Sequence, residues 1–346
     1  MTIFLYKRKI YLYKINKSGD IIILSSVYYS IVLCTDNGSN TSERVIMKIN
    51  KTSLPLHPYL LLFISILSVS VSSIMIKSSH TPTSVAGMYR LYMSVILMLP
   101  FVPWKMLRTS DMTKKDWGTV FLAGLFLGLH FLFWMESLVY TSVASSMVIL
   151  SLQPLFVMIG SYFMFRERVN LLTIFCLIAA LIGSIIIAWG DIGTSKGALI
   201  GDGLSLLGTI LVSAYMIAGQ KVSHKISANF YSVIVFFLGG SVLLIYNLVN
   251  HYSLIEYDSS DWMYFVLLAV IPTIFGQYIF NLLLKSMGAT TVSVGIIGEP
   301  VLAILLAYVF LGEIMSAFQF IGGIMTLFGM GMYFWAKSLK FAVAKY

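Results

Sequence analysis

The sequence predicts an all-α integral membrane protein, with ten transmembrane helices arranged as two inverted five-helix repeats around a central cavity. Three observations support this fold class. The 346 residues are 58% hydrophobic and 11% charged, whereas soluble domains carry about 25% charged residues. Ten apolar stretches are long enough to cross a bilayer, and landmarks recur between the two halves of the chain. This composition excludes a soluble enzyme and a nucleic-acid-binding module, and the lipid bilayer becomes the expected surroundings.

The ten apolar segments each approach the 20 or so residues that a helix needs to cross roughly 30 Å of hydrocarbon. They cover residues 58–77, 84–104, 117–138, 143–165, 170–190, 201–220, 230–250, 262–284, 289–311 and 316–336. With residue 57 placed inside, the inner loops carry fourteen Lys and Arg residues and the outer loops carry two. Because cytoplasmic loops collect such residues, both ends of the ten-helix unit are predicted to lie in the cytoplasm of a plasma-membrane protein.

Residues 1–56 form an atypical extension that is basic at first and then apolar. The apolar run 21–34 is short for a membrane span. Two interpretations stay open: an extra hydrophobic segment, or a mis-assigned start with Met47 as the true first residue. The first five-helix repeat is then residues 57–192, and the second, with a basic tail, is residues 193–346.

An internal repeat determines the predicted architecture. Pairs of landmarks recur at an offset of 145 or 146 residues, namely Asp116-Trp117 with Asp261-Trp262, Pro154 with Pro300, Glu167 with Glu313, Gly183 with Gly329, and Trp189 with Trp335. Each copy contains five spans, so the second copy must enter the membrane from the opposite face. The halves are therefore inverted repeats, and transporter folds of this form place their site near the midplane between the repeats.

Three motifs of the first half, Thr141-Ser142-Val143-Ala144, Gln153-Pro154 and Arg166-Glu167-Arg168, are echoed in the second half by Gly288-Ala289-Thr290, Glu299-Pro300 and Gly312-Glu313. With these motifs in two five-helix halves, the chain resembles the EamA-like family of the drug/metabolite transporter superfamily over roughly residues 57–340. The resemblance implies ten helices around a central cavity and the export of small metabolites, amino acids or drugs.

Gln153 and Glu299 are the leading candidates for a substrate site. Each sits near the middle of its span and precedes a proline, which removes a backbone donor and frees a carbonyl one turn earlier. A charge at the bilayer centre is costly and usually faces a cavity or a partner. Glu299 is also the candidate for proton coupling. The alternative is a packing kink whose polar side chain bonds a neighbouring helix.

Arg90 and Glu136 are the other intramembrane charges, and counting along their helices places them at similar depth. We expect them to pair with each other or to converge on one substrate carboxylate; a structural ion pair or snorkelling is the alternative.

Two polar stripes also enter the membrane region. His130 and Trp134 are one turn apart, as are Gln277 and Asn281, and the stripes are related by an offset of 147 residues. We expect them to face each other across the cavity, although His130 is also consistent with ordinary hydrogen-bonded packing.

The hypothesis that follows is a secondary transporter that moves small metabolites, amino acids or drug-like molecules by alternating access, with proton coupling as an extension. A flippase for a lipid or polyprenyl-linked carrier is the alternative. Because the sequence contains no nucleotide-binding loop, metal-ligand spacing or acid/base constellation, it predicts no enzyme activity, cofactor or metal. Glycines near the end of the chain predict close helix packing, either within one protomer or in a homodimer.

Overall fold

The structure is a computed structural model of the 346-residue chain. It describes residues 2–6, 9–15, 21–26, 54–78, 81–104, 111–141, 143–167, 171–189, 197–311 and 316–343. The chain divides into two compact units, a helical bundle at Leu56–Ala336 and a second unit made of Met1–Pro55 and Lys337–Tyr346. The two units are described separately.

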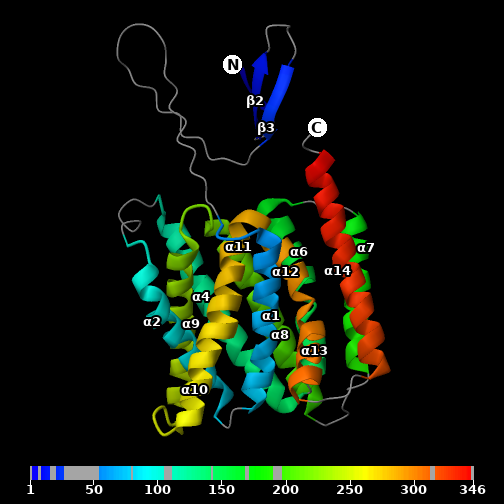
Figure 1. Cartoon of the computed structure of the whole chain (residues 1–346). Helices are drawn as coiled ribbons and strands as arrows, with labels where there is room; N and C mark the ends of the chain where they lie inside the picture. Colours follow the sequence, from blue (N-terminus) through cyan, green and yellow to red (C-terminus); the bar gives the residue numbers. More distant parts are fainter. Residues whose placement is uncertain are drawn as a thin grey trace. The chain divides into compact units, whose positions relative to one another are not determined.

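The bundle is built from helices in the order that the hydropathy pattern predicts (Figure 1). The elements are α1 (Pro58–Ser78), α2 (Thr83–Met98), η1 (Leu99–Phe101), α4 (Lys114–Tyr140), α5 (Val143–Leu150), α6 (Gln153–Phe165), α7 (Leu171–Trp189), α8 (Ala198–Val222), α9 (Ala228–Val249), α10 (Ser259–Leu268), η2 (Ala269–Tyr278), α11 (Ile279–Met287), α12 (Ala289–Ile296), α13 (Glu299–Leu311) and α14 (Ala317–Val343). Among the described residues, eight segments are long and apolar enough to cross a membrane, and two shorter apolar helices fall at Pro58–Ser72 and Leu171–Ile187. Together they match the ten predicted spans.

The beginning of the chain forms a small antiparallel sheet. Its strands are β1 (Thr2–Tyr6), β2 (Lys9–Ile15) and β3 (Ile21–Ser26), in the order β1-β2-β3. Residues 21–26, the first part of the apolar run discussed above, are therefore a strand. The rest of that run and Met47 lie outside the described residues.

The two halves of the bundle interlock. The first helix of the second half, α8, packs against α4, α5 and α6 of the first half, while α1 packs against η2, α11 and α13 of the second half. The second helices of the halves, α2 and α9, also pack against each other. The first helix of each half therefore packs against several elements of the other half, and this reciprocal pattern agrees with the inverted repeat that the landmarks predict.

Two of the membrane-crossing segments are broken at equivalent places. The first break separates α5 from α6 just before Gln153-Pro154, and the second separates α12 from α13 just before Glu299-Pro300. Proline has no N–H and therefore cannot donate to the carbonyl four residues earlier, but it fits the first turn of a new helix. The sequence thus places a half-helix start inside the bundle in each repeat.

Close contact between α7 and α14 depends on glycine. A Cβ atom at Gly183 would lie 2.5 Å from the backbone nitrogen of Thr326, and one at Gly329 would lie 2.6 Å from that of Ala180. These repeat-related glycines pack within one protomer. By contrast, a Cβ at Gly331 would meet no atom within 4 Å.

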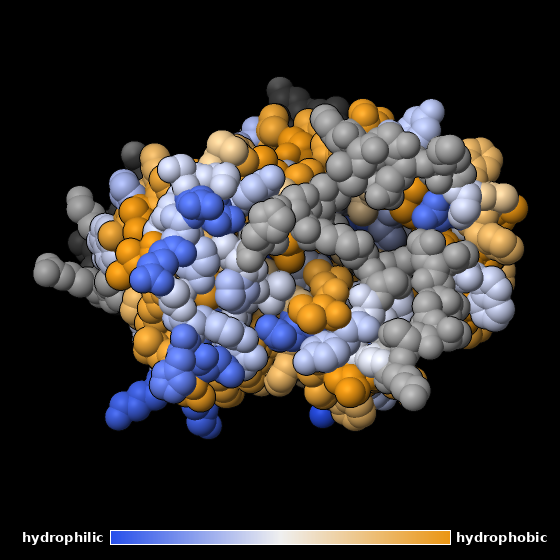
Figure 2. All heavy atoms as spheres, turned by 90° about the horizontal axis from the view of Figure 1, so that it is seen from below, coloured by the Kyte–Doolittle hydropathy of each residue, from blue (hydrophilic) through white to orange (hydrophobic). Residues whose placement is uncertain are grey.

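The outside of the bundle is apolar, as a lipid-facing surface requires. Large side chains such as Leu171 and Phe163 are 84% and 79% exposed. Figure 2 looks onto one end of the molecule, where hydrophilic residues gather on the end face and hydrophobic residues follow much of the rim.

Candidate functional site

A small pocket lined by both apolar and polar side chains lies inside the bundle, between the two halves. Its volume is about 40 Å³, and its lining residues are Val69, Ser72, Arg90, His130, Phe131, Trp134, Leu150, Gln153, Val212, Met216, Gln277, Phe280, Ile296 and Glu299. Six of the eight side chains singled out from the sequence are in this set. A water molecule needs roughly 10–15 Å³ of such space. The pocket therefore has room for a few waters and must widen before it can hold a metabolite.

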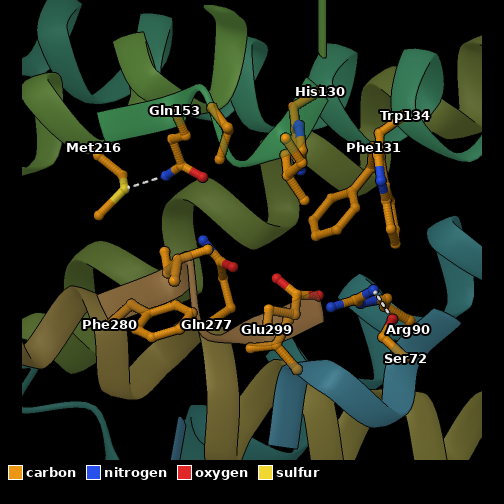
Figure 3. A pocket seen from close by; sticks show the side chains of 14 residues that line it. Ser72, Arg90, His130, Phe131, Trp134, Gln153, Met216, Gln277, Phe280 and Glu299 are labelled. Carbon is orange, nitrogen blue, oxygen red and sulfur yellow. Dashed lines mark hydrogen bonds between the residues drawn. The ribbon is translucent and has the colours of Figure 1, made fainter. Parts of the chain in front are cut away.

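Gln153 and Glu299 both reach this pocket. Each begins a half-helix, and their side chains are only 2% and 3% exposed. Gln153 Nε2 donates to Met216 Sδ at 2.7 Å. The start of a helix carries a partial positive charge, so the first turn of α13 favours a negative charge on Glu299. The two residues lie on opposite sides of the same pocket and not on the lipid face (Figure 3).

Arg90 is held by three helices that meet at the pocket. Its Nε donates to Thr273 Oγ1 at 2.9 Å, its Nη1 donates to Ser72 Oγ at 3.1 Å, and its guanidinium carbon lies 4.3 Å from the centre of the Phe131 ring. The side chain is 1% exposed. Figure 3 shows the guanidinium pointing toward the Glu299 carboxyl, and the two groups interact electrostatically. The cation and the anion are thus brought together from different halves.

Thr273 lies in η2, a π-helical stretch that also contains Pro272. Its hydroxyl donates to the Leu268 carbonyl at 2.8 Å and at the same time accepts from Arg90 Nε. Short π-helical stretches often occur at functional sites, and here one turns a hydroxyl toward the pocket.

The expected pairing of Arg90 with Glu136 is corrected by the structure. Glu136 Oε1 accepts from Thr83 Oγ1 at 3.1 Å, and Glu136 does not line the pocket. Residues two apart on a helix point roughly 200° apart. Since Trp134 faces the pocket, Glu136 must point elsewhere. Arg90 and Glu136 therefore do not pair, although their positions along the helices place them at similar depth in the membrane.

His130 and Trp134 line the pocket from α4, as their spacing predicts. His130 Nδ1 bonds the Gly208 carbonyl at 2.9 Å and therefore carries the hydrogen, and its ring stacks near that of Trp134 with centroids 6.1 Å apart. Gly208 lets α8 pack closely against α4 at this point, because a Cβ atom at Gly208 would lie 3.2 Å from the Trp134 backbone nitrogen. The Trp134 Nε1–H is buried and has no hydrogen-bond partner in the described part of the chain. It is therefore available to a ligand with an acceptor atom.

Gln277 and Asn281, the polar stripe expected on the opposite side of the cavity, have different roles. Gln277 lines the pocket and faces the His130 side of it (Figure 3). Asn281, one turn later, is 4% exposed, accepts from the Tyr215 hydroxyl and donates to Ser232 Oγ at 2.9 Å. Asn281 thus belongs to a buried polar network behind the pocket, not to its wall.

Sequence reasoning did not identify Ser72, Phe131 and Thr273, the three residues that fix Arg90. One signal was available for Thr273, which follows a proline and lies one turn before Gln277. For metal ions, the described residues contain no group of three His, Cys, Asp or Glu side chains that could hold one.

Comparison with known proteins identifies the family. The sequence profile of the EamA-like transporter family matches residues 56–189 and 199–335, once for each half. The chain belongs to the EamA-like transporter family. It is accordingly a multi-pass membrane protein and a transporter, and the two matches coincide with the two repeats.

Curated relatives and a solved structure agree with this assignment. The chain is 23% identical over 227 residues to the uncharacterized transporter YxxF of Bacillus subtilis (strain 168), covering 65% of this chain and 72% of that protein. It is 28% identical over 271 residues to the uncharacterized transporter YetK of the same organism, covering 74% and 78%. A crystal structure of a protein that is 17% identical superposes with a TM-score of 0.68 over 82% of this chain and 98% of the other, which supports the fold.

Proposed function

We propose that this EamA-family protein is a secondary transporter that exports small polar or amphipathic metabolites by alternating access, and that the pocket between its halves is the substrate site. The observation that carries this proposal is the buried Arg90 and Glu299 pair at the meeting point of two broken helices. Burying charged groups costs several kcal/mol per ion even after relaxation. Side chains that remain charged inside a membrane usually serve a substrate or ion pathway.

The pocket offers complementary groups to a small polar ligand. Arg90 and the free Nε1–H of Trp134 suit an acceptor or anionic group, while Glu299 and the amide oxygens of Gln153 and Gln277 suit a donor or cationic group. Arg90 is the one Lys or Arg among the lining residues. A multiply charged lipid headgroup would need more cations than this, so a small metabolite fits the pocket better than a lipid-linked carrier.

Contacts between the halves close the bundle toward both ends of α8. Near the start of α8, Asp202 Oδ1 accepts from Thr141 Oγ1 at 2.8 Å. Near its end, Gln220 Nε2 donates to Glu167 Oε1 at 3.0 Å. Each bond joins a residue of the first repeat to one of the second. Both contacts and the small pocket of about 40 Å³ support a narrow state of the proposed cycle, from which we expect the halves to open toward one side at a time.

Proton coupling would follow from competition for Glu299. In the closed pocket Arg90 balances the carboxylate. When the halves move apart, a proton or a cationic substrate group takes the place of the guanidinium. A carboxyl that exchanges its counter-ion once per cycle can link substrate movement to a proton gradient. The excess of Lys and Arg in one set of loops supports placing both ends of the ten-helix unit in the cytoplasm.

The test is a comparison of metabolites inside and outside cells that make the parent protein, the Glu299→Gln variant, or neither. We expect one or a few small polar compounds to appear in the medium only with the parent protein. Those compounds are then assayed in proteoliposomes with and without a pH gradient. Export by Glu299→Gln at the parent rate would refute the substrate role, and transport that ignores the gradient would refute proton coupling.

A further inference from the structure

Two buried serines each face two carbonyl acceptors, one on their own helix and one in the other half of the protein. Ser70 donates at 2.8 Å to the carbonyl one turn earlier in α1 and lies 3.2 Å from the Glu299 carbonyl. Ser213 does the same on α8, at 2.7 Å to its own helix and 3.3 Å to the Gln153 carbonyl. The two serines thus contact the equivalent residues of the two repeats.

Two further hydroxyls repeat this pattern. Thr209 donates at 2.8 Å within α8 and lies 3.4 Å from the Ile149 carbonyl at the end of α5. Ser94 donates at 2.6 Å within α2 and lies 3.0 Å from the Ala269 carbonyl at the start of η2. Both hydroxyl-bearing residues are 0% exposed. In all four cases the bond within the helix is the shorter one, and the longer contact crosses between the halves.

The four distant carbonyls also share a location. They belong to residues at or next to an interruption of a membrane-crossing segment: the break before α6, the break before α13, or the beginning of the π-helical stretch. These are the segments that carry Gln153, Glu299 and Thr273. A motion that opens the pocket must displace them relative to α1, α2 and α8.

A hydroxyl with two acceptors suits a contact that must break repeatedly inside a membrane. The bilayer core provides no water to replace a lost hydrogen bond, so a stranded donor costs several kcal/mol. Ser and Thr in helices readily donate to the carbonyl one turn earlier. When the halves separate, each of these hydroxyls keeps its shorter bond, and only an additional contact to a carbonyl is lost.

We propose that Ser70, Ser94, Thr209 and Ser213 form a hydroxyl seam on which the two halves move, and that their cross-half contacts favour the closed pocket by holding the broken helices in place. This inference rests on the proposed function, because it specifies the contacts that change during alternating access. The seam residues are positioning residues. Ser70 and Ser213 act on Glu299 and Gln153 through their backbone carbonyls, Thr209 and Ser94 act on the neighbouring interruptions, and none of the four lines the pocket.

The same helices provide matched controls. Ser68 lies two residues from Ser70 on α1 and donates to the Ile64 carbonyl at 2.8 Å within its own helix. It tests whether removal of any helix hydroxyl loosens the bundle. Thr209 allows a change of chemistry at constant shape, because Thr209→Val removes the hydroxyl and keeps the volume, whereas Thr209→Ser keeps the hydroxyl.

The experiment measures how often the pocket opens, independently of any substrate. In a background with Cys34→Ala and Cys176→Ala, the lining residue Phe280 is changed to Cys. The rate of labelling by a membrane-impermeant maleimide is then measured in whole cells and in inverted membrane vesicles. We expect the parent reporter to be labelled slowly from both faces. A hydrogen bond between membrane helices contributes a factor of about threefold on average, so Thr209→Val combined with Ser213→Ala should speed labelling by about tenfold.

The controls decide between the seam and a general loosening. Thr209→Ser and Ser68→Ala should both be labelled at the parent rate. Parent-rate labelling of the folded double variant, or equal acceleration by Ser68→Ala, would overturn the seam and leave the proposed transport function standing. A reporter that reacts from only one face, or from neither, would overturn alternating access itself and the seam with it. Size-exclusion elution and protein level identify any variant that has not folded, in which case Thr209→Val alone is compared with Thr209→Ser.

Discussion

The Arg90 guanidinium and the Glu299 carboxyl face each other inside one buried pocket, although they come from different halves of the chain (Figure 3). If only one of the two charges were present, the closed pocket would bury it without a counter-charge. The pair therefore connects the stability of the closed bundle to its function, because any ligand or proton that binds one of the two charges changes the environment of the other.

The first prediction concerns this pair. Removing either of these two buried groups takes away its electrostatic partner and should destabilise the protein, because the other charge is left uncompensated. We expect Arg90→Met to lower the thermal stability of the detergent-solubilised protein markedly, and Arg90→Met combined with Glu299→Gln to recover much of the loss. Transport should be absent from both. Arg166→Met, which changes an exposed arginine, should leave stability near that of the parent. Equal stabilities of the single and double variants would show that the two charges are not coupled.

The second prediction uses the unpartnered indole of Trp134. Because its Nε1–H has no partner in the described structure, Trp134→Phe removes no internal hydrogen bond, and the smaller buried ring should lower the unfolding temperature only moderately. If a substrate acceptor bonds this group, its loss should raise KM by about 2- to 10-fold, the usual worth of one hydrogen bond. Transport assays of the identified metabolite measure KM, and Trp117→Phe, on the same helix but away from the pocket, is the control. An unchanged KM would exclude Trp134 Nε1 from substrate recognition.

The third prediction separates the two intramembrane glutamates. Glu136 accepts from Thr83 through Oε1, and a glutamine amide oxygen can accept in the same way. We therefore expect Glu136→Gln to transport at close to the parent rate, whereas Glu299→Gln should lose transport by tenfold or more. Both changes remove one negative charge without a large change of shape, so each serves as the control for the other. A loss of transport in Glu136→Gln would instead indicate that Glu136 takes part in substrate binding or passage.

The sequence was sufficient to predict the repeats and the residues at their breaks. Gln153 and Glu299 could be found because the sequence itself shows a polar residue before a proline in the middle of an apolar span. The second copy of this pattern, in the other repeat, supports the assignment. The ten spans followed from the same hydropathy pattern. These features depend on local chemistry and on the thickness of the bilayer.

The partner of Arg90 could not be predicted in the same way. Counting residues gives the depth of a side chain but neither the face of the helix that carries it nor the helix that packs against that face. The placement of Arg90 depends on Thr273, which lies in the π-helical stretch η2 and accepts a hydrogen bond from Arg90 Nε. The hydroxyl seam could not be predicted from the sequence for a similar reason. Serines are common in apolar helices, and only the packing of helices such as α1 and α8 shows which of them contact the other half.

The last prediction concerns the crossing of α7 and α14. A glycine-to-alanine change in a helix normally gains up to about 1 kcal/mol, because alanine restricts the unfolded chain and favours the helix. At Gly183 the added Cβ would lie 2.5 Å from the Thr326 backbone nitrogen, and a backbone atom cannot move aside as a flexible side chain can. Overpacking of this kind costs about 1–3 kcal/mol.

We therefore expect Gly183→Ala to lower the unfolding temperature, and Gly331→Ala, where the added Cβ meets no atom within 4 Å, to keep or raise it. Thermal unfolding in one detergent, followed by tryptophan fluorescence, compares the two directly. Gly329→Ala should resemble Gly183→Ala, because its Cβ would meet the backbone nitrogen of Ala180 at 2.6 Å. If all three variants were equally stable, α7 and α14 would have to be farther apart at Gly183 and Gly329 than the structure places them.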